Sequence, residues 1–256
     1  MFLVPGKEAG FLRESNVPHG EVRMVYYQSE GTDKVRRMHI YFPPGYDETQ
    51  QQYPVVYLLH GGGDNDDGWI SIGRANFIMD NLIDLGQSKP MIVVMPSIWV
   101  FDPPVPADRR QENNEEFARS LIEDIIPFVD EHYRTLSGPE NRAIGGLSYP
   151  NILPDILFAN MDKFNYAGFT SNGLTAERLE YYNEKWPGRI ADRQNSERIK
   201  IWIGDGTNAF TYSSSRYLAE AMPEYGYKTT FYETEGIHGW PWFRRYFAEW
   251  STHLFR

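Results

Sequence analysis

The sequence contains no cysteine in its 256 residues. Disulfide bonds, thiolate-bound zinc and cysteine nucleophiles are therefore excluded, while the redox compartment stays open. The sequence also has no apolar run near the ~20 residues that a membrane-spanning helix needs. Its first ten residues hold only a brief apolar stretch before Pro5 and Lys7, too short for the core of a signal peptide. We therefore expect a soluble protein, either cytoplasmic or a secreted mature form.

Basic residues are scarce relative to acidic ones: 25 Lys and Arg stand against 35 Asp and Glu, which gives a net charge of −10. Nucleic acids and anionic membranes bind clustered positive charge, so neither partner is expected. The acidic loop at residues 64–67 lacks the spacing of an EF-hand, and the glycines at 61–63 are not followed by the Gly-Lys-Ser/Thr of a phosphate loop. We predict no metal and no cofactor, and the oligomeric state stays open.

What the sequence does contain is a regular alternation of short apolar segments with longer amphipathic ones. This pattern predicts an α/β fold in which helices cover both faces of a mostly parallel sheet. We expect a flexible segment at residues 1–20 and a single domain over residues 21–256. The predicted strands cover residues 36–46, 53–63, 90–97, 142–148, 165–171, 199–206 and 228–236, and the predicted helices cover 75–86, 115–133, a segment after 148, 213–226 and 241–255.

A serine stands where the predicted strand at 142–148 ends and a helix begins. Gly146-Leu147-Ser148 supplies the first half of a G-x-S-x-G elbow, the sharp turn that presents a nucleophile. The alternative is an ordinary serine at the end of a strand, because a lone G-x-S is common. Ser148 is nevertheless our candidate nucleophile, because ligand sites of such sheets lie at the carboxyl ends of the strands.

Two further strand ends carry residues suited to the same chemistry. His60 precedes the glycine turn 61–63, in which the Gly62 N–H can face a developing oxyanion; the alternative is a plain flexible turn. His238 is the histidine that follows the last predicted strand in a loop, where it can act as a general base toward a serine. We interpret His60 as structural and His238 as the candidate base.

Taken together, these motifs resemble α/β-hydrolases of the esterase D type, in particular the feruloyl and acetylxylan esterases of carbohydrate esterase family 1. The resemblance covers nearly all of residues 20–256. It implies Ser148 as nucleophile, His238 as base, and the backbone N–H groups of Gly62 and Tyr149 as the oxyanion hole. The motifs that carry it are "YFPPGY", "YPVVYLLHGGG", "GRANFIMDNLI", "RAIGGLS", "DKFNYAGF", "IWIGDGTN" and "ETEGIHGWPWFRRY".

The sequence departs from the family pattern immediately after the serine. Tyr149-Pro150-Asn151 stands where the family has Met-Gly-Gly or a close variant. The proline ring disfavours helical backbone at the residue before it, which is Tyr149, the expected oxyanion donor. Losing one such donor costs on the order of 3 kcal/mol, or ~100-fold or more in rate. We therefore expect a distorted elbow.

The second departure concerns the acid that orients the histidine. The family has an aspartate in a Gly-Thr-x-Asp turn, and Ala209 occupies that place here. Asp205 is our first choice as a substitute, while Asn208 and Glu235 are alternatives. Without an orienting acid the histidine can adopt the wrong tautomer, and the corresponding change in a serine protease lowers the rate by ~10⁴-fold.

Aromatic residues gather in the loops expected around the site. They would suit a planar phenolic acyl group or a sugar ring, so the expected ligand is a small aryl or acyl ester, or a feruloylated or acetylated glycan. For one of Trp240 and Trp242, anchoring the final helix is an equally good interpretation. The candidate substrate-binding residues are Trp69, Trp99, Phe101, Trp240 and Trp242, beside Tyr149.

Two functions follow from these observations. The first is a carboxylic ester hydrolase that works through a Ser148 acyl-enzyme with an impaired or rearranged triad. The second is a non-hydrolytic homologue that binds phenolic or glycan ligands, or catalyses a different reaction in the same pocket. Ester turnover and covalent labelling of the serine distinguish the two.

Overall fold

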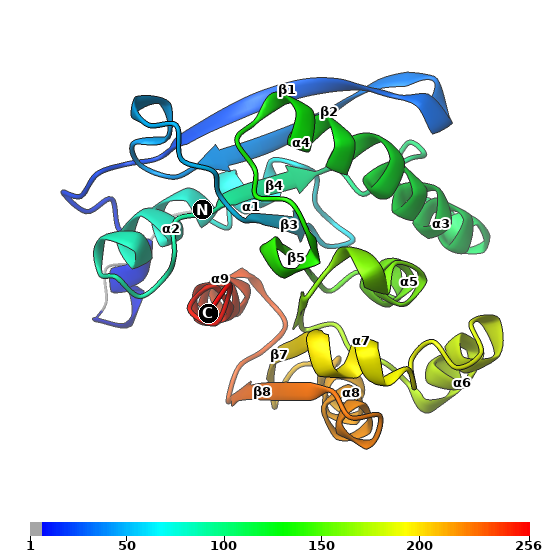
Figure 1. Ribbon diagram of the computed structural model, residues 1–256. Helices are drawn as coiled ribbons and strands as arrows, with labels where there is room; N and C mark the ends of the chain where they lie inside the picture. The colour runs from blue at the N-terminus through cyan, green and yellow to red at the C-terminus, as the bar shows by residue number, and fades with distance from the viewer. Residues whose placement is uncertain (1–6) are drawn as a thin grey trace.

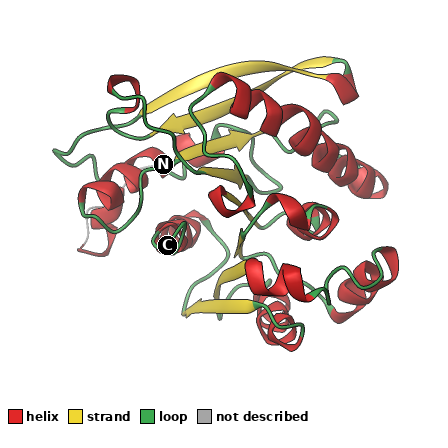
Figure 2. Ribbon diagram, viewed as in Figure 1, coloured by secondary structure: helices red, strands yellow, loops and turns green. Residues whose placement is uncertain are grey.

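A computed structural model describes residues 7–256, in which eight strands form one twisted sheet (Figures 1 and 2). Strands β3 to β8 run parallel to one another, whereas β1 pairs antiparallel with β2, and β2 with β4. The sheet order is β1-β2-β4-β3-β5-β6-β7-β8. The strands are β1 Glu21–Ser29, β2 Lys34–Phe42, β3 Val55–Leu59, β4 Ile92–Pro96, β5 Arg142–Leu147, β6 Tyr166–Thr170, β7 Lys200–Gly206 and β8 Lys228–Thr234.

Helices cover both faces of this sheet, which confirms the predicted fold class (Figure 1). The apolar core is accordingly divided in two: one cluster contains α2 and α9, and the other contains α3, α4, α5 and α8. The central strands β3, β4 and β6 are buried along their whole length, as expected of parallel strands covered on both sides. The helices are α1 Gly68–Ser71, α2 Ala75–Asp84, α3 Arg110–Ser120, α4 Ile126–His132, α5 Ile152–Ala159, α6 Ala176–Lys185, α7 Arg193–Arg198, α8 Tyr212–Glu224 and α9 Trp240–Ser251. A π-helical turn, Leu121–Ile125, joins α3 to α4 within the stretch predicted as one helix.

Glycines let α9 approach the sheet closely. A Cβ atom built on Gly145 of β5 or on Gly168 of β6 would lie 2.4 Å from the Trp250 ring of α9. Only hydrogen at these two positions leaves room for the indole, so the sequence of the strands fixes the depth at which α9 packs. The loop from β8 into α9, which carries His238, is thereby held over the carboxyl end of the sheet.

Residues 7–20, part of the segment predicted to be flexible, are fixed to the domain in the structure. The Asn81 side chain of α2 donates hydrogen bonds to the carbonyl groups of Phe11 and Arg13 at 3.0 and 2.9 Å. The Asp80 carboxylate, also on α2, accepts from the Gly20 N–H at 2.8 Å. These bonds to buried side chains of α2 hold the segment in place, while residues 1–6 lie outside the described residues. No helix within residues 7–256 combines the length and apolar character needed to cross a membrane.

Candidate active site

Ser148 lies on the sharp turn between β5 and α5, where the elbow motif predicted it. Its φ angle of +62° is in the left-handed region, as is the +65° of Asn151 just before α5. Such a backbone costs on the order of 1–3 kcal/mol for a residue with a side chain, and strain of this kind gathers at functional sites. The Ser148 N–H donates to the Thr170 carbonyl of β6 at 3.0 Å, which ties the turn to the neighbouring strand.

The loop between β8 and α9 brings His238 onto this serine. The Ser148 Oγ and His238 Nε2 atoms are 2.7 Å apart, so the two side chains share a hydrogen bond. Burial lowers the pKa of His238 below its usual 6.5, and the charge of Asp205 opposes that shift. The imidazole is therefore neutral at neutral pH, the state in which its Nε2 atom can accept the proton of the serine hydroxyl.

The glycine turn that follows β3 lies directly against the elbow. A Cβ atom on Gly61 would lie 2.4 Å from the Leu147 Cδ1 atom, and one on Gly62 would lie 3.2 Å from the Tyr149 ring. Gly61 therefore leaves no room for a side chain, and Gly62 leaves little, so the chain passes close to Ser148. The backbone of the predicted oxyanion turn therefore borders Ser148.

The second predicted oxyanion donor is engaged within the elbow itself. The Tyr149 N–H donates to the Leu147 carbonyl at 2.6 Å, across the strained Ser148. The Tyr149 side chain is buried and packs edge-to-face on Trp99, with ring centroids 5.1 Å apart. In this conformation the amide that would complete an oxyanion hole is occupied by a neighbouring carbonyl.

Asp205, the predicted orienting acid, lies near His238 without reaching it. Its carboxylate is fully buried and accepts hydrogen bonds from the hydroxyls of Ser171 at 2.8 Å and Ser215 at 2.7 Å. None of the hydrogen bonds described for residues 7–256 joins Asp205 to His238. The His238 Nδ1 atom instead has the Thr211 hydroxyl as its neighbour, at 3.4 Å.

Neither alternative partner, Asn208 or Glu235, makes a hydrogen bond to the imidazole among those described for residues 7–256. The Asn208 side chain donates to the carbonyl of Glu235 at 3.1 Å. Glu235 itself is exposed, and Ala209, which stands in the family's aspartate position, is buried. The described residues thus hold a serine–histidine pair whose Nδ1 partner is a hydroxyl.

The predicted aromatic residues divide between the core and the loops of the site. Trp69 was proposed as a substrate-binding residue, but this is wrong because only 1% of its surface is exposed and its indole N–H donates to the Leu59 carbonyl. Trp240 packs edge-to-face on Trp69 at 5.1 Å and so anchors the start of α9. Trp242, in the same turn, lies against Gly236.

The remaining two aromatic residues belong to the segment that follows β4. Trp99 is half-buried; its indole N–H donates to the Asp64 carbonyl at 2.8 Å, and its ring packs on Tyr149, the residue after Ser148. Phe101 is half-buried, with the Arg109 guanidinium 3.8 Å above its ring. Of these two, Trp99 has a contact with the elbow.

Two exposed apolar side chains beside the histidine were missed from the sequence. Phe210 is 79% exposed and its ring centroid lies 4.3 Å from that of His238, while Ile237 is 58% exposed. Exposed aromatic surface next to a serine–histidine pair of this kind is suited to bind an apolar part of a ligand. The sequence did hold a signal for Phe210: it directly follows Ala209, the residue in the family's aspartate position, and that position is expected near His238.

His60 has the structural role that the sequence predicted. Its Nδ1 atom lies 2.9 Å from the Gly61 carbonyl, and its Nε2 atom accepts the Ile98 N–H at 3.0 Å. Burial lowers the pKa of His60 to about 4, so the ring is neutral and joins the glycine turn to the chain beyond β4. This neutral ring helps to hold the two loops that border Ser148.

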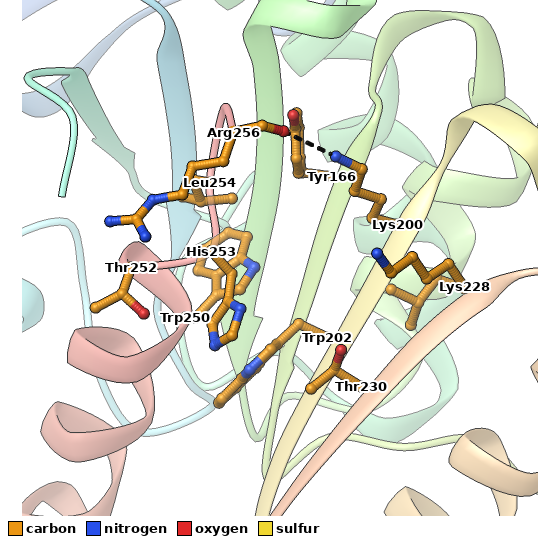
Figure 3. A pocket seen from close by; sticks show the side chains of 11 residues that line it. Tyr166, Lys200, Trp202, Lys228, Thr230, Trp250, Thr252, His253, Leu254 and Arg256 are labelled. Carbon is orange, nitrogen blue, oxygen red and sulfur yellow. Dashed lines mark hydrogen bonds between the residues drawn. The ribbon is translucent and has the colours of Figure 1, made fainter. Parts of the chain in front are cut away.

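The opposite end of the sheet has a separate cavity of about 270 Å³ (Figure 3). It is formed by the first residues of β7 and β8 and by the end of α9, among them Lys200, Trp202, Lys228 and His253. Ser148 and His238 lie at the carboxyl ends of the strands and are not part of it. Within residues 7–256, no group of three His, Asp or Glu side chains is placed to hold a metal ion.

Comparison with known proteins shows to which family the chain belongs. Residues 29–254 match a family model described as "Putative esterase". The chain belongs to this esterase family. The resemblance predicted from the sequence motifs is therefore confirmed, and the serine–histidine pair lies within the matched residues.

The esterase is similar to parts of longer curated proteins. It is 31% identical over 260 residues to an endo-1,4-beta-xylanase/feruloyl esterase of Xylanibacter ruminicola, which covers 99% of this chain and 34% of that protein. It is 22% identical over 270 residues to endo-1,4-beta-xylanase Y of Acetivibrio thermocellus, which covers 91% of this chain and 23% of that protein. The chain thus spans about a third or less of these relatives.

Solved structures show the same fold for this esterase. A CE1 ferulic acid esterase of Anaeromyces mucronatus, solved with ferulic acid, has a TM-score of 0.78 and 24% identity, covering 95% of this chain and 93% of that one. A feruloyl esterase module of Clostridium thermocellum, solved with sinapinate, has a TM-score of 0.78 and 18% identity, covering 99% and 93%. At these identities the likeness concerns the fold alone.

Proposed function

We propose that this esterase hydrolyses carboxylic esters through an acyl-enzyme formed on Ser148. The observation that carries the proposal is the 2.7 Å contact between the Ser148 Oγ and His238 Nε2 atoms, on a turn whose strained backbone presents the hydroxyl. A nucleophile within hydrogen-bond reach of a neutral base is the arrangement that acyl transfer needs. Family membership points to the same reaction.

The proposed reaction has two halves. The Ser148 Oγ atom attacks the ester carbonyl carbon while His238 Nε2 takes its proton, and His238 then returns that proton to the departing alcohol. A water molecule, deprotonated by the same imidazole, attacks the acyl-enzyme and releases the acid. The backbone of the Gly62 turn borders the serine, so its N–H is the donor we assign to the developing oxyanion.

We further propose that the acyl group is aromatic, of the hydroxycinnamoyl type, and that the alcohol is a sugar hydroxyl of a plant glycan. The exposed Phe210 beside His238 and the Trp99 ring beside the elbow offer flat apolar surfaces for such a group. The names of the relatives, a xylanase/feruloyl esterase and a ferulic acid esterase bound to ferulic acid, support this choice.

The test is turnover of methyl ferulate and p-nitrophenyl acetate by the wild type and by Ser148→Ala. We expect hydrolysis that is lost in the variant, and a fluorophosphonate that labels the wild type at Ser148 alone. Hydrolysis that persists unchanged in Ser148→Ala would refute the assignment of the nucleophile. Absence of any turnover together with absence of labelling would refute the esterase.

A non-hydrolytic binding function is the second candidate, favoured by two specific contacts. The Tyr149 N–H is occupied by the Leu147 carbonyl, and the Nδ1 atom of His238 faces a hydroxyl where a triad has a carboxylate. A binding protein of this kind would be stabilised thermally by ferulate or a feruloylated oligosaccharide without ester turnover. Labelling of Ser148 by the fluorophosphonate would exclude the inert version.

A further inference from the structure

Thr211 stands at the N-cap of α8, yet its side chain does not cap the helix. A threonine in this position ordinarily accepts a hydrogen bond from a backbone N–H of the first turn, which stabilises the helix by ~1 kcal/mol. The Thr211 hydroxyl makes no such bond, and its backbone is helical, with φ of −86° and ψ of −10°. The hydroxyl lies instead 3.4 Å from the Nδ1 atom of His238.

The proton on His238 has one position compatible with catalysis. Its Nε2 atom is 2.7 Å from the Ser148 hydroxyl, so Nε2 must be unprotonated to act as a base. The neutral ring then carries its hydrogen on Nδ1, which needs an acceptor to keep the ring in this tautomer and orientation. Thr211 is the acceptor that the described residues provide, and such contacts are often long before substrate binds.

The same turn of α8 also reaches the buried carboxylate. Thr211 and Ser215 are four residues apart, so their side chains project from one face of the helix. The Ser215 hydroxyl donates to Asp205 at 2.7 Å, while the Thr211 hydroxyl faces the imidazole. The first turn of α8 therefore places one hydroxyl next to the His238 ring and another in a hydrogen bond with the Asp205 carboxylate.

Asp205 is also held in place by a second hydroxyl, from a residue with a strained backbone. The Ser171 hydroxyl donates to it at 2.8 Å, and Ser171 has a φ angle of +43° although it is not a glycine. A strained residue that holds a fully buried carboxylate near a catalytic pair calls for a functional explanation. The carboxylate makes no hydrogen bond to His238 among the described residues, so Asp205 can act on the ring only through its charge, which raises the pKa of His238.

We propose that Thr211 is the positioning residue that keeps His238 in the Nδ1–H tautomer, and that Asp205, held by Ser171 and Ser215, acts on the ring by charge at a distance. This arrangement takes over the task of the aspartate that Ala209 replaces. It rests on the proposed function, since orienting His238 matters for rate only if His238 activates Ser148.

The test compares Thr211→Val, which keeps the shape and removes the hydroxyl, with Thr211→Ser, which keeps the hydroxyl. With p-nitrophenyl acetate we expect kcat to fall about tenfold in Thr211→Val with KM unchanged, as loss of one hydrogen bond predicts, and to recover in Thr211→Ser. Ser214→Ala is the matched control, because Ser214 donates to the Thr211 carbonyl at 2.8 Å in the same helical turn. It should leave kcat unchanged.

Imidazole NMR separates this proposal from the esterase function, because it requires no turnover. We expect ¹⁵N shifts of the Nδ1–H tautomer in the wild type, a mixed tautomer in Thr211→Val, and a lower His238 pKa in Asp205→Asn because the charge that raises it is removed.

Wild-type kcat and tautomer in Thr211→Val would overturn the role of Thr211, and so would an equal loss of kcat in Ser214→Ala. An unshifted pKa in Asp205→Asn would overturn the role of Asp205. If Ser148→Ala keeps full activity while these NMR changes occur, the proposed function fails and the positioning stands.

Discussion

The Ser148 hydroxyl and the His238 imidazole are 90 positions apart in the sequence and 2.7 Å apart in space. Because burial lowers the pKa of His238 below 6.5, the base is neutral across neutral pH and becomes protonated only in more acidic solution. We predict that kcat/KM for p-nitrophenyl acetate is constant around pH 7 and falls about tenfold per pH unit below the pKa of His238. A pH–rate profile with its acid limb centred above pH 7 would contradict this assignment.

Restoring a carboxylate at position 209 should increase activity. Ala209 is buried in the turn before α8, two residues from Thr211 and one from Phe210, whose ring contacts His238. A carboxylate here can accept the Nδ1–H bond and stabilise the imidazolium that forms during the reaction, an effect of up to ~10⁴-fold in a serine protease. We expect Ala209→Asp to raise kcat by about tenfold or more, measured with p-nitrophenyl acetate. Ala209→Asn, of the same size without the charge, is the control and should give a smaller gain; an equal gain would argue against charge stabilisation.

Phe210 should determine the preference for esters with an aromatic acyl group. Its ring is 79% exposed and contributes little to the core, so truncation should leave the thermal unfolding temperature nearly unchanged. Stacking of one aromatic pair contributes about 0.5–1.5 kcal/mol, or roughly two- to tenfold in binding. We expect Phe210→Ala to raise KM for methyl ferulate by this factor and to leave KM for p-nitrophenyl acetate unaltered. A parallel change for both esters would show that Phe210 acts on His238 and not on the acyl group.

Much of the fold could be predicted because its central strands are apolar on both faces and several of its helices have a clear periodicity. The exceptions include the outer strand β1, whose exposed and charged positions weaken the apolar signal, and α6 and α7, whose polar sequences were not predicted as helices. Each lies at the periphery, where burial leaves the weakest pattern. The sequence pattern is thus most informative for the buried centre of the sheet, which is the part that positions the site.

The candidate site was predictable only in part, for a related reason. Ser148 and His238 follow strand ends, so chain order alone indicates that they lie at the same edge of the sheet. Thr211 carries no such signal, because a threonine before a helix is ordinarily a cap, and only the placement of α8 against the His238 loop shows its hydroxyl facing the ring. Trp69 was misassigned since its burial depends on the packing of α9.

Two glycines of the turn after β3, Gly61 and Gly63, should differ sharply in their tolerance of a side chain. A methyl group on Gly61 would lie 2.4 Å from the Leu147 Cδ1 atom, whereas one on Gly63 would meet nothing within 4 Å. We expect Gly61→Ala to displace the elbow and lower kcat by about 100-fold, the effect of losing one oxyanion donor. Gly63→Ala is the matched control and should retain wild-type kcat. Equal kcat in the two variants would show that the turn does not contact the nucleophile in solution.

His60 should make the stability of the fold depend on pH. Its folded pKa of about 4 lies below the ordinary value of 6.5, so between these values the unfolded chain binds more protons than the folded one. The stabilising contribution is therefore fully present above pH 6.5 and is lost as the pH falls toward 4, by about 2 kcal/mol at pH 5. The measurement is the free energy of unfolding in urea at pH 7 and pH 5, for the wild type and for the non-titrating His60→Gln. Other groups titrate alike in both proteins, so the wild type should lose about 2 kcal/mol more than the variant; an equal loss would mean that His60 is accessible to protons in the folded state.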